Sequence, residues 1–365
     1  MYLLIYFGGF MADLFENPMG TNGFEFVEYA HPEPEKLRDL FDKLGFKIVA
    51  KHKSKNVTLH RQGQINFIIN AEPDSFAQRF AKEHGPCACA MAFRVKNAQD
   101  VFKKLIKKGA IPIKNEKNLG PGELDIPAIE GIGGSRLYLV DKFEGETIYD
   151  YDFDFIDGVN ASVKGNGLTY VDHLTHNVYQ GNMDKWSAFY EDLFNFREIR
   201  YFDIEGKLTG LVSRAMTSPC GKIRIPINES QDNKSQIVEY LEKYKGEGIQ
   251  HIALGTQDIY SSVEGLRNNG VTFLTTPATY YEKVDARVPE HGEDLERMKN
   301  LHILVDGAPT DGQGTLLQIF TKEVIGPIFF ELIQRKGNEG FGEGNFQALF
   351  DSIEEDQIRR GVLKA

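Results

Sequence analysis

The chain has 365 residues, 41% of them hydrophobic and 26% charged, and carries a net charge of −11 with a pI near 5.4. This composition is typical of a soluble globular protein, and the length leaves room for two domains that each bury a core of their own. The acidic balance, without a clustered stripe of Lys and Arg, argues against a nucleic-acid partner.

The first ten residues, MYLLIYFGGF, are apolar but too few to span a bilayer. They have no basic n-region and no small-residue cleavage site, so they do not resemble a signal peptide. We therefore expect residues 1–10 to be a dispensable extension before Met11, and we expect no membrane partner. Three cysteines cannot form a disulfide framework, and their odd number indicates a reducing compartment. Together these features predict a cytoplasmic protein.

A weak internal repeat runs along the chain. Residues 23–52 and 170–202 share one plan: a strand, a polar turn, an amphipathic helix and a second strand. Residues 87–113 and 249–274 share another, in which a strand precedes a helix that ends near a glycine. The repeat predicts four βαβββ-like units, two in each of two domains.

The domain junction is predicted within residues 151–167, YDFDFIDGVNASVKGNG. This stretch has little apolar periodicity and many Gly, Asn and Asp residues. It divides the chain into an N-terminal domain at 11–155 and a C-terminal domain at 168–365.

Three polar residues of the C-terminal half stand in short apolar runs: His173 in LTYVDHLTHNV, His251 in GIQHIAL and Glu331 in GPIFFELIQR. An ionised carboxylate in such a run is costly to bury unless a cation compensates it. Two imidazoles and one carboxylate form the facial triad that holds non-haem Fe(II) and leaves positions open for substrate and dioxygen. The gaps, 251 − 173 = 78 and 331 − 251 = 80 residues, suit ligands on separate strands of one sheet.

A single histidine in an apolar run is more often structural than a metal ligand. His176 lies three residues after His173, and an odd separation on a strand predicts opposite faces. We expect His176 to be structural.

Several motifs, in the same order along the chain, resemble those of one family, the 4-hydroxyphenylpyruvate dioxygenases. The resemblance covers the chain from Met11 to its end. It is densest in VDHLTHNV (171–178), PINE (226–229), GIQHIAL (248–254), GTLLQIFTK (314–322), FFELIQR (329–335) and GFGEGNFQALFDSIE (340–354).

The resemblance implies an α+β fold, with two domains of paired βαβββ modules of the vicinal oxygen chelate (glyoxalase/bleomycin resistance-like) type, each an open curved sheet barrel. It implies that His173, His251 and Glu331 hold one Fe(II) per subunit. The implied reaction converts 4-hydroxyphenylpyruvate and dioxygen to homogentisate and carbon dioxide, in tyrosine and phenylalanine catabolism. Relatives are dimers or tetramers, so a homo-oligomer is expected.

The N-terminal domain is expected not to bind the metal. Glu28 stands where His173 stands in the repeat, and Ala90 stands roughly where His251 does. No ligand appears near residues 138–141, the counterpart of the stretch that ends in Glu331. The chemistry is therefore expected in the C-terminal half alone.

Further roles are implied by matching the family's motifs residue by residue. Uncharged polar groups that contact substrate fall on Ser213, Asn228, Gln236, Gln250 and Gln318. For Ser213 a surface hydroxyl is the alternative. The aromatic and polar pocket wall falls on Phe320, Phe329, Phe341, Asn345 and Phe346, with a purely core role as the alternative for Phe320 and Phe329.

The C-terminal segment is predicted to act as a lid. Residues 337–345 contain four glycines, which suits a hinge. A helix at about 345–361 then places Phe346, Leu349, Phe350 and Ile353 on one apolar face. The resemblance favours docking of this face over the iron site, and a helix packed permanently on the core is the alternative.

Three other functions remain open at this point. A 4-hydroxymandelate synthase has the same triad and substrate but hydroxylates the benzylic carbon. A non-catalytic ligand-binding protein of this fold would not need the triad. An extradiol catechol dioxygenase shares fold and triad but lacks the C-terminal GFGEGNF segment.

Overall fold

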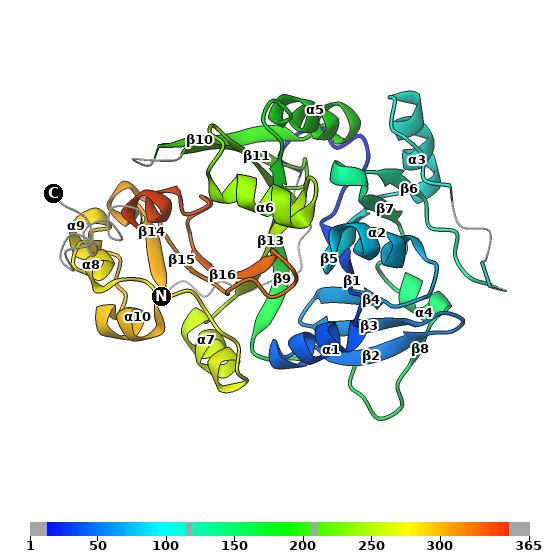
Figure 1. The fold of residues 1–365 in the computed structure, drawn as a ribbon, viewed down its shortest axis with the longest axis horizontal. Coiled ribbons are helices and arrows are strands. Elements are labelled where there is room, and N and C mark those ends of the chain that lie inside the picture. Colours follow the sequence, from blue (N-terminus) through cyan, green and yellow to red (C-terminus); the bar gives the residue numbers. More distant parts are fainter. Residues whose placement is uncertain (1–12, 115–118, 121, 206–209, 350–365) are drawn as a thin grey trace.

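The computed structural model describes residues 13–114, 119–120, 122–205 and 210–349. Its strands form two eight-stranded sheets, one in each half of the chain, which lie side by side with helices around them (Figure 1). The orders are β6-β7-β5-β1-β4-β3-β2-β8 in the first sheet and β10-β11-β12-β9-β13-β16-β15-β14 in the second. The second sheet curls strongly, and the face on the inside of the curl is called its inner face (Figure 1).

The strands of the first sheet are β1 Phe24–Ala30, β2 Lys47–His52, β3 Val57–Gln62, β4 Ile65–Asn70, β5 Cys87–Arg94, β6 Ala128–Glu130, β7 Arg136–Val140 and β8 Phe153–Phe155. The helices of this half are α1 Pro34–Lys43, α2 Phe76–His84, α3 Ala98–Lys107 and α4 Ile148–Asp152.

The strands of the second sheet are β9 Leu168–Val178, β10 Arg197–Glu205, β11 Gly210–Thr217, β12 Arg224–Ser230, β13 Gly248–Thr256, β14 Leu304–Gly307, β15 Thr315–Phe320 and β16 Phe329–Lys336. The helices of this half are α5 Met183–Phe194, α6 Gln236–Tyr244, α7 Ile259–Asn268, α8 Ala278–Tyr281, α9 Val284–Arg287 and α10 Leu295–Leu301.

Local side-chain chemistry sets several helix ends. Asn97 precedes α3 and accepts a hydrogen bond from the amide of Asp100, and Asp258 accepts one from Ser261 before α7. After these two helices, Gly109 and the equivalent residue 270 adopt positive φ angles of 98° and 86°. Glycine takes this left-handed conformation at no steric cost, so both helices end where the sequence predicts.

The predicted βαβββ units are confirmed, with one rearrangement. The sets β1-α1-β2-β3-β4 and β9-α5-β10-β11-β12 each make one unit, and β13, α7 and β14 to β16 make another. In the second unit of the first half, β5, α3, β6 and β7 lie together, but β8 pairs with β2 at the opposite edge of the sheet. The α+β fold class of two glyoxalase-like halves is therefore correct.

The largest buried cluster spans both halves of the molecule. It includes Phe67 of β4 and Phe330 of β16, whose ring centroids lie 5.9 Å apart. His84 of α2 stacks on Tyr244 of α6 at 4.9 Å and bonds its backbone oxygen. The opposite face of the first sheet carries a separate cluster around Phe26. The shared core fixes the two sheets against each other.

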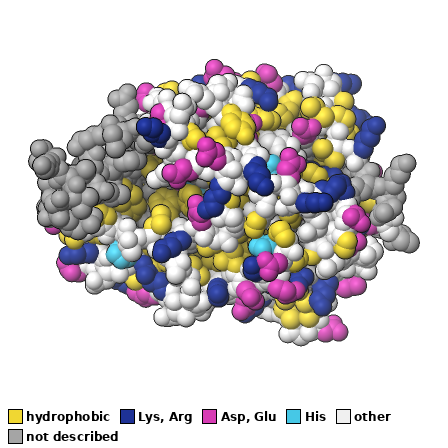
Figure 2. All heavy atoms as spheres, viewed as in Figure 1, with side chains coloured by type: hydrophobic (Ala, Val, Ile, Leu, Met, Phe, Trp, Pro, Cys, Tyr) yellow, Lys and Arg dark blue, Asp and Glu magenta, His cyan; other side chains and the backbone are white. Residues whose placement is uncertain are grey.

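Acidic and basic side chains are interspersed on the face shown in Figure 2, and the described residues there form no continuous basic patch. None of the described helices is both long and apolar enough to cross a membrane.

Candidate metal centre

Three adjacent strands bring the predicted ligands together. His173 of β9 lies opposite Ala253 of β13, and Ala253 is the parallel partner of Glu331 on β16. One step along the sheet, His251 lies opposite Thr175. Because side chains on one face alternate with period two, His173, His251 and Glu331 all point from the inner face. Their candidate ligand atoms lie within 4.8 Å of one another.

The two imidazoles converge on one carboxylate oxygen. Glu331 Oε2 lies 3.2 Å from His173 Nε2 and 3.4 Å from His251 Nε2. Glu331 is 2% exposed, and burial alone raises the pKa of a carboxyl group. The neighbouring imidazoles outweigh this effect and lower the pKa of Glu331 to about 2. The site therefore holds a buried carboxylate beside two nitrogen donors, which is a donor set that fits a divalent metal ion.

The ring of His173 is oriented from behind by a buried acid. Its Nδ1 lies 2.8 Å from Oδ1 of Asp172, which is fully buried. A carboxylate only accepts hydrogen bonds, so Nδ1 carries a hydrogen, and the other ring nitrogen, Nε2, lies on the side of Glu331. Burial lowers the pKa of His173, but Glu331 and Asp172 outweigh this effect and raise the pKa above its ordinary value. Arg335 grips the same carboxylate with Nε and Nη2, each at 2.8 Å. Burial raises the pKa of Asp172, but Arg335 and His173 hold it well below its ordinary value.

The ring of His251 is oriented by an amide. Gln250 Oε1 lies 2.9 Å from His251 Nδ1, and a carboxamide oxygen likewise only accepts. Thr175 Oγ1 lies 3.0 Å from His251 Nε2, on the side of the ring that faces Glu331. Burial is the main cause of the lowered pKa of His251, so this ring is neutral at neutral pH and its Nε2 is a competent ligand.

The predicted polar contacts occupy different places. Ser213 of β11 pairs with Asn228 of β12, and Asn228 pairs with Asn177 of β9, two residues beyond Thr175. Ser213 and Asn228 are therefore on the inner face, and Ser213 is 6% exposed and not a surface hydroxyl. Gln236, by contrast, is exposed on the first turn of α6. A substrate contact of Gln236 stays a prediction.

Gln318 links the candidate metal centre to the C-terminal segment through hydrogen bonds. Its amide nitrogen donates to Glu331 Oε1 at 2.7 Å and to the backbone oxygen of Phe341 at 3.0 Å. Its oxygen accepts from Asn345 Nδ2 at 2.8 Å. Both amide hydrogens are thus engaged. In this arrangement Gln318 positions the carboxylate of Glu331 and holds the segment in place. A Cβ on Gly342 would lie 1.8 Å from Gln318 Oε1, so only glycine fits there.

The predicted aromatic residues surround the ligands. Phe329 stacks on His251 with centroids 5.0 Å apart, and Phe341 meets the edge of His173 at 5.4 Å. Phe320 lies 6.1 Å from Phe329 and 6.5 Å from Phe346. Phe320 and Phe329 are only half-buried, which favours the predicted pocket wall over a purely core role.

The C-terminal segment is described only in part. Residues 343–349 are helical, and Phe346 is half-buried. Phe350, Ile353 and the remainder of the predicted helix at 345–361 lie outside the described residues.

His176 lies on the other face of β9 from His173 and Thr175. It is 1% exposed, and neither ring nitrogen has a hydrogen-bond partner among the described residues. Burial lowers its pKa to about 3, so the ring is neutral. This agrees with a structural role.

The register corrects one correspondence between the halves. Ala90 pairs with Glu28 as His251 pairs with Thr175, so Ala90 does stand at the position of His251. Glu28 therefore matches Thr175, and the counterpart of His173 is Phe26, two residues earlier. The sequence comparison was wrong by one period of the strand, because it aligned residues without knowing which pairs face each other.

Sequence reasoning also missed residues that support the site. Asp172, Thr175 and Arg335 contact the two histidines or their partners. Phe202 has its ring 6.3 Å from that of Phe341, and Tyr280 and Arg287 donate to Asn345 Oδ1. An acid beside His173 in an apolar run was a readable signal for Asp172. Nothing local indicates that Arg335, 163 residues away, is its partner.

Known protein families match both halves of the chain. The family described as hydroxyphenylpyruvate dioxygenase, HPPD, N-terminal, matches residues 15–154. The glyoxalase/bleomycin resistance protein/dioxygenase superfamily matches residues 170–286. The 4-hydroxyphenylpyruvate dioxygenase of Pseudomonas aeruginosa is 62% identical over 350 residues, covering 95% of this chain and 97% of that protein.

Two further relatives carry other names. A Vibrio vulnificus protein named hemolysin VllY is 62% identical over 352 residues, covering 95% of this chain and 98% of that protein. The solved structure of a triple mutant of 4-hydroxymandelate synthase from Streptomyces coelicolor matches with a TM-score of 0.79 at 25% identity. That match covers 93% of this chain and 100% of the other.

Proposed function

The chain belongs to the 4-hydroxyphenylpyruvate dioxygenase family, and we propose that it converts 4-hydroxyphenylpyruvate and dioxygen to homogentisate and carbon dioxide. The observation that carries the proposal is the buried cluster of His173, His251 and Glu331 in a chain 62% identical to a protein of that name. These residues would hold Fe(II), since two neutral imidazoles and a carboxylate are the donors that non-haem Fe(II) oxygenases use.

When bound there, Fe(II) would supply the one-electron chemistry that activates dioxygen and a Lewis-acidic site for the 2-oxo acid. The reaction needs no separate reductant. Dioxygen takes up four electrons, two from the loss of the substrate carboxylate as carbon dioxide and two from hydroxylation of the ring. Both oxygen atoms enter the products.

The protein's own contribution is to orient the substrate and exclude water. Phe320 and Phe329 offer half-buried ring faces next to His251, and Phe341 covers His173. Asn228 and Ser213, on the inner face, offer hydrogen bonds without a charge that would compete for the metal. Fixing the ring beside the metal position lowers the entropic cost of reaction, and a dry pocket prevents side reactions.

The runner-up is a 4-hydroxymandelate synthase, because a solved mutant of such an enzyme from Streptomyces shares the fold of this chain. That relative is 25% identical, whereas the relatives named 4-hydroxyphenylpyruvate dioxygenase reach 53–62%. The name hemolysin is that of the Vibrio vulnificus relative and is not carried over to this chain.

Product identification tests the proposal. The Fe(II)-loaded protein is incubated with 4-hydroxyphenylpyruvate and dioxygen, and aromatic products are separated by chromatography. Homogentisate, with one carbon dioxide released per dioxygen consumed, is the expected result. Mainly 4-hydroxymandelate would establish the runner-up, and no reaction by an iron-replete protein would leave a non-catalytic binding protein.

Three predictions made from the sequence stay predictions: a homo-oligomer (dimer or tetramer), a cytoplasmic location, and domain limits at 11–155 and 168–365.

A further inference from the structure

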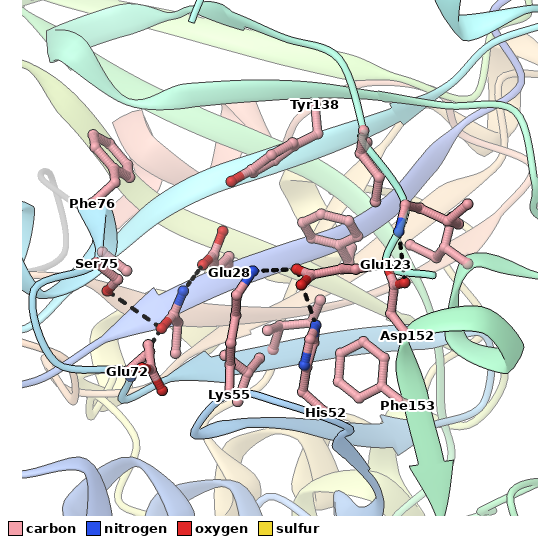
Figure 3. Close-up of a pocket in the computed structure, with 18 of the residues that line it drawn as sticks. Glu28, His52, Lys55, Glu72, Ser75, Phe76, Glu123, Tyr138, Asp152 and Phe153 are labelled. Atoms are coloured by element: carbon pink, nitrogen blue, oxygen red, sulfur yellow. Dashed lines mark hydrogen bonds and ion pairs between the residues drawn. The ribbon is translucent and has the colours of Figure 1, made fainter. Parts of the chain in front are cut away.

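A cavity lies in the N-terminal half, with a volume of about 190 Å³. Its floor is one face of the first sheet. Alternate residues of three strands contribute to it: Phe26 and Glu28 of β1, Ile68 and Asn70 of β4, and Arg136 and Tyr138 of β7. Across the cavity stand Phe76 at the start of α2, Glu123 and Leu124, and Asp152 of α4. Figure 3 shows Tyr138 and Glu28 directed into it from different strands.

This cavity occupies the same place in its sheet as the metal centre does in the other. With Ala90 matched to His251, the strand pairings fix the remaining correspondences. They are Phe26 for His173, Glu28 for Thr175, Asn70 for Asn228, Val57 for Ser213, Arg136 for Phe329 and Tyr138 for Glu331. A phenyl ring, a methyl group and a phenol therefore replace the three candidate metal ligands, while the hollow is retained.

The polar side chains that line this cavity are held by hydrogen bonds and ion pairs. Asn70 Nδ2 donates to Glu28 Oε1 at 2.7 Å, and Arg136 Nη1 donates to the Tyr138 hydroxyl at 3.3 Å. On the other side, Lys55 pairs with Glu123, whose carboxylate also lies 3.5 Å from His52 Nε2 (Figure 3). These contacts fix the side chains before any ligand arrives.

The charge of the lining is negative. Four acids (Glu28, Glu72, Glu123 and Asp152) face two bases (Lys55 and Arg136), which gives −4 + 2 = −2. Burial is the main cause of the lowered pKa of His52, so its ring adds no charge at neutral pH. Burial also raises the pKa of Asp152, which marks a carboxylate that a bound cation would stabilise.

The walls suit an aromatic ring and a cation. Rings come from Phe26, Phe76, Tyr138 and Phe153, and Phe26 and Tyr138 have centroids 5.6 Å apart. The Arg136 guanidinium already lies 4.0 Å from the centroid of the Phe76 ring. Aromatic faces attract organic cations, and an apolar cavity of about 150 Å³ is known to hold benzene. The available volume therefore fits one ring with a short side chain.

We propose that this N-terminal cavity is a binding site for a single-ring aromatic amine, separate from the metal centre. The ammonium group would lie among the carboxylates, beside Glu28, and the ring would lie against Phe26 and Tyr138. The site needs no metal and does not depend on the catalytic activity proposed above.

The test is calorimetric binding to the full-length, iron-loaded protein under anaerobic conditions. Phenethylamine is the probe, and 3-phenylpropanoate, a single-ring acid of similar size, is the matched anion. The amine should bind at least about tenfold more tightly than the acid. Its Kd should not change when 4-hydroxyphenylpyruvate saturates the metal centre. Absence of amine binding, preference for the acid, or competition with 4-hydroxyphenylpyruvate would each overturn the proposal.

Variants then locate the site. Glu28→Gln keeps the shape and the hydrogen bond from Asn70 but removes the charge. The Kd of the amine should therefore rise by about tenfold or more. Tyr138→Phe is the second variant and should weaken binding several-fold. Glu35→Gln removes an exposed acid on α1 and should leave binding unchanged. Unaltered affinity in folded Glu28→Gln and Tyr138→Phe, or an equal loss in Glu35→Gln, would contradict the assignment. No outcome depends on turnover, so failure here is separate from failure of the proposed reaction.

Discussion

Around Glu331, two kinds of neighbour determine how the carboxylate behaves. His173 and His251 favour its charged form, and Gln318 fixes its other oxygen with a hydrogen bond of 2.7 Å. Behind His173, the ion pair of Asp172 and Arg335 sets the orientation of the imidazole, with Nε2 on the side of Glu331. Such outer partners orient metal ligands and raise their basicity.

Replacement of Glu331 tests the ligand set. Glu331→Gln should keep the fold but lose most of the iron, because a neutral amide cannot help neutralise Fe(II). Glu331→Ala should abolish turnover. Iron content by elemental analysis and oxygen uptake with 4-hydroxyphenylpyruvate measure the two effects. Glu28→Gln, in the N-terminal half, should leave the iron content unchanged. Wild-type iron content and oxygen uptake in Glu331→Ala would show that the triad is wrong.

Replacement of Asp172 tests the orienting ion pair. Asp172→Asn leaves the Arg335 guanidinium without its buried counter-charge, which should cost roughly 3–5 kcal/mol of unfolding free energy. Iron affinity should also fall by about 10- to 100-fold. Urea unfolding and metal titration measure these changes. The matched control is Asp184→Asn, since Asp184 pairs with Arg214 but its side chain is 89% exposed. Equal effects in the two variants would rule out a special role for Asp172.

At the scale of elements, the segment after β16 is held by backbone contacts from the site itself. Arg335 Nη1 donates to the backbone oxygen of Gly340 at 2.6 Å, and Gln318 bonds that of Phe341. Tyr280 of α8 donates to Asn345 Oδ1 at 2.6 Å, and Arg287 of α9 donates to the same oxygen. Two of these groups also belong to the site, because Gln318 bonds Glu331 and Arg335 bonds Asp172 behind His173.

Phe346→Ala tests the predicted lid. Loss of the ring that faces Phe320 should raise KM for 4-hydroxyphenylpyruvate and increase oxygen consumption that yields no homogentisate, because water enters the pocket. Iron content should stay unchanged. The neighbouring Gln347→Ala, at an exposed position, is the control. Tight coupling of oxygen uptake to product in Phe346→Ala would end the lid hypothesis. Truncation after Gln334 is less clean, because it also removes Arg335.

At the scale of the whole molecule, one buried cluster runs through both halves. Phe67 of the first sheet stacks on Phe330 of the second, and His84 packs on Tyr244. A shared core of this kind couples the stability of the two sheets. The N-terminal half thus contributes to the stability of the half that carries the candidate metal centre.

The shared core predicts one cooperative unfolding transition. The single tryptophan, Trp186, reports on the C-terminal half, and the buried thiols of Cys87 and Cys89 report on the N-terminal half once Cys220→Ser removes the third thiol. Trp fluorescence and thiol labelling should give coincident midpoints in urea. Phe330→Ala should lower the unfolding free energy by roughly 3–5 kcal/mol, and the midpoints of both probes should fall together. Two separate transitions would show that the halves are stable independently.

The sequence by itself determined the fold class, the repeat, the helix ends and the three candidate ligands. These features are local: an apolar period, a glycine after a helix, or a polar residue inside a short motif can be read without knowing what lies across the strand. The substrate-contact and pocket predictions, such as those for Ser213 and Phe329, came instead from the resemblance to the family.

Only the tertiary structure decided which residues face each other. It paired Asp172 with Arg335, moved β8 to the edge beside β2, and matched Phe26, not Glu28, to His173. It also left Gln236 exposed and placed a cavity beside Glu28. The physical reason is the register of the strands. A shift of one period exchanges every cross-strand neighbour while leaving the local pattern of the sequence unchanged.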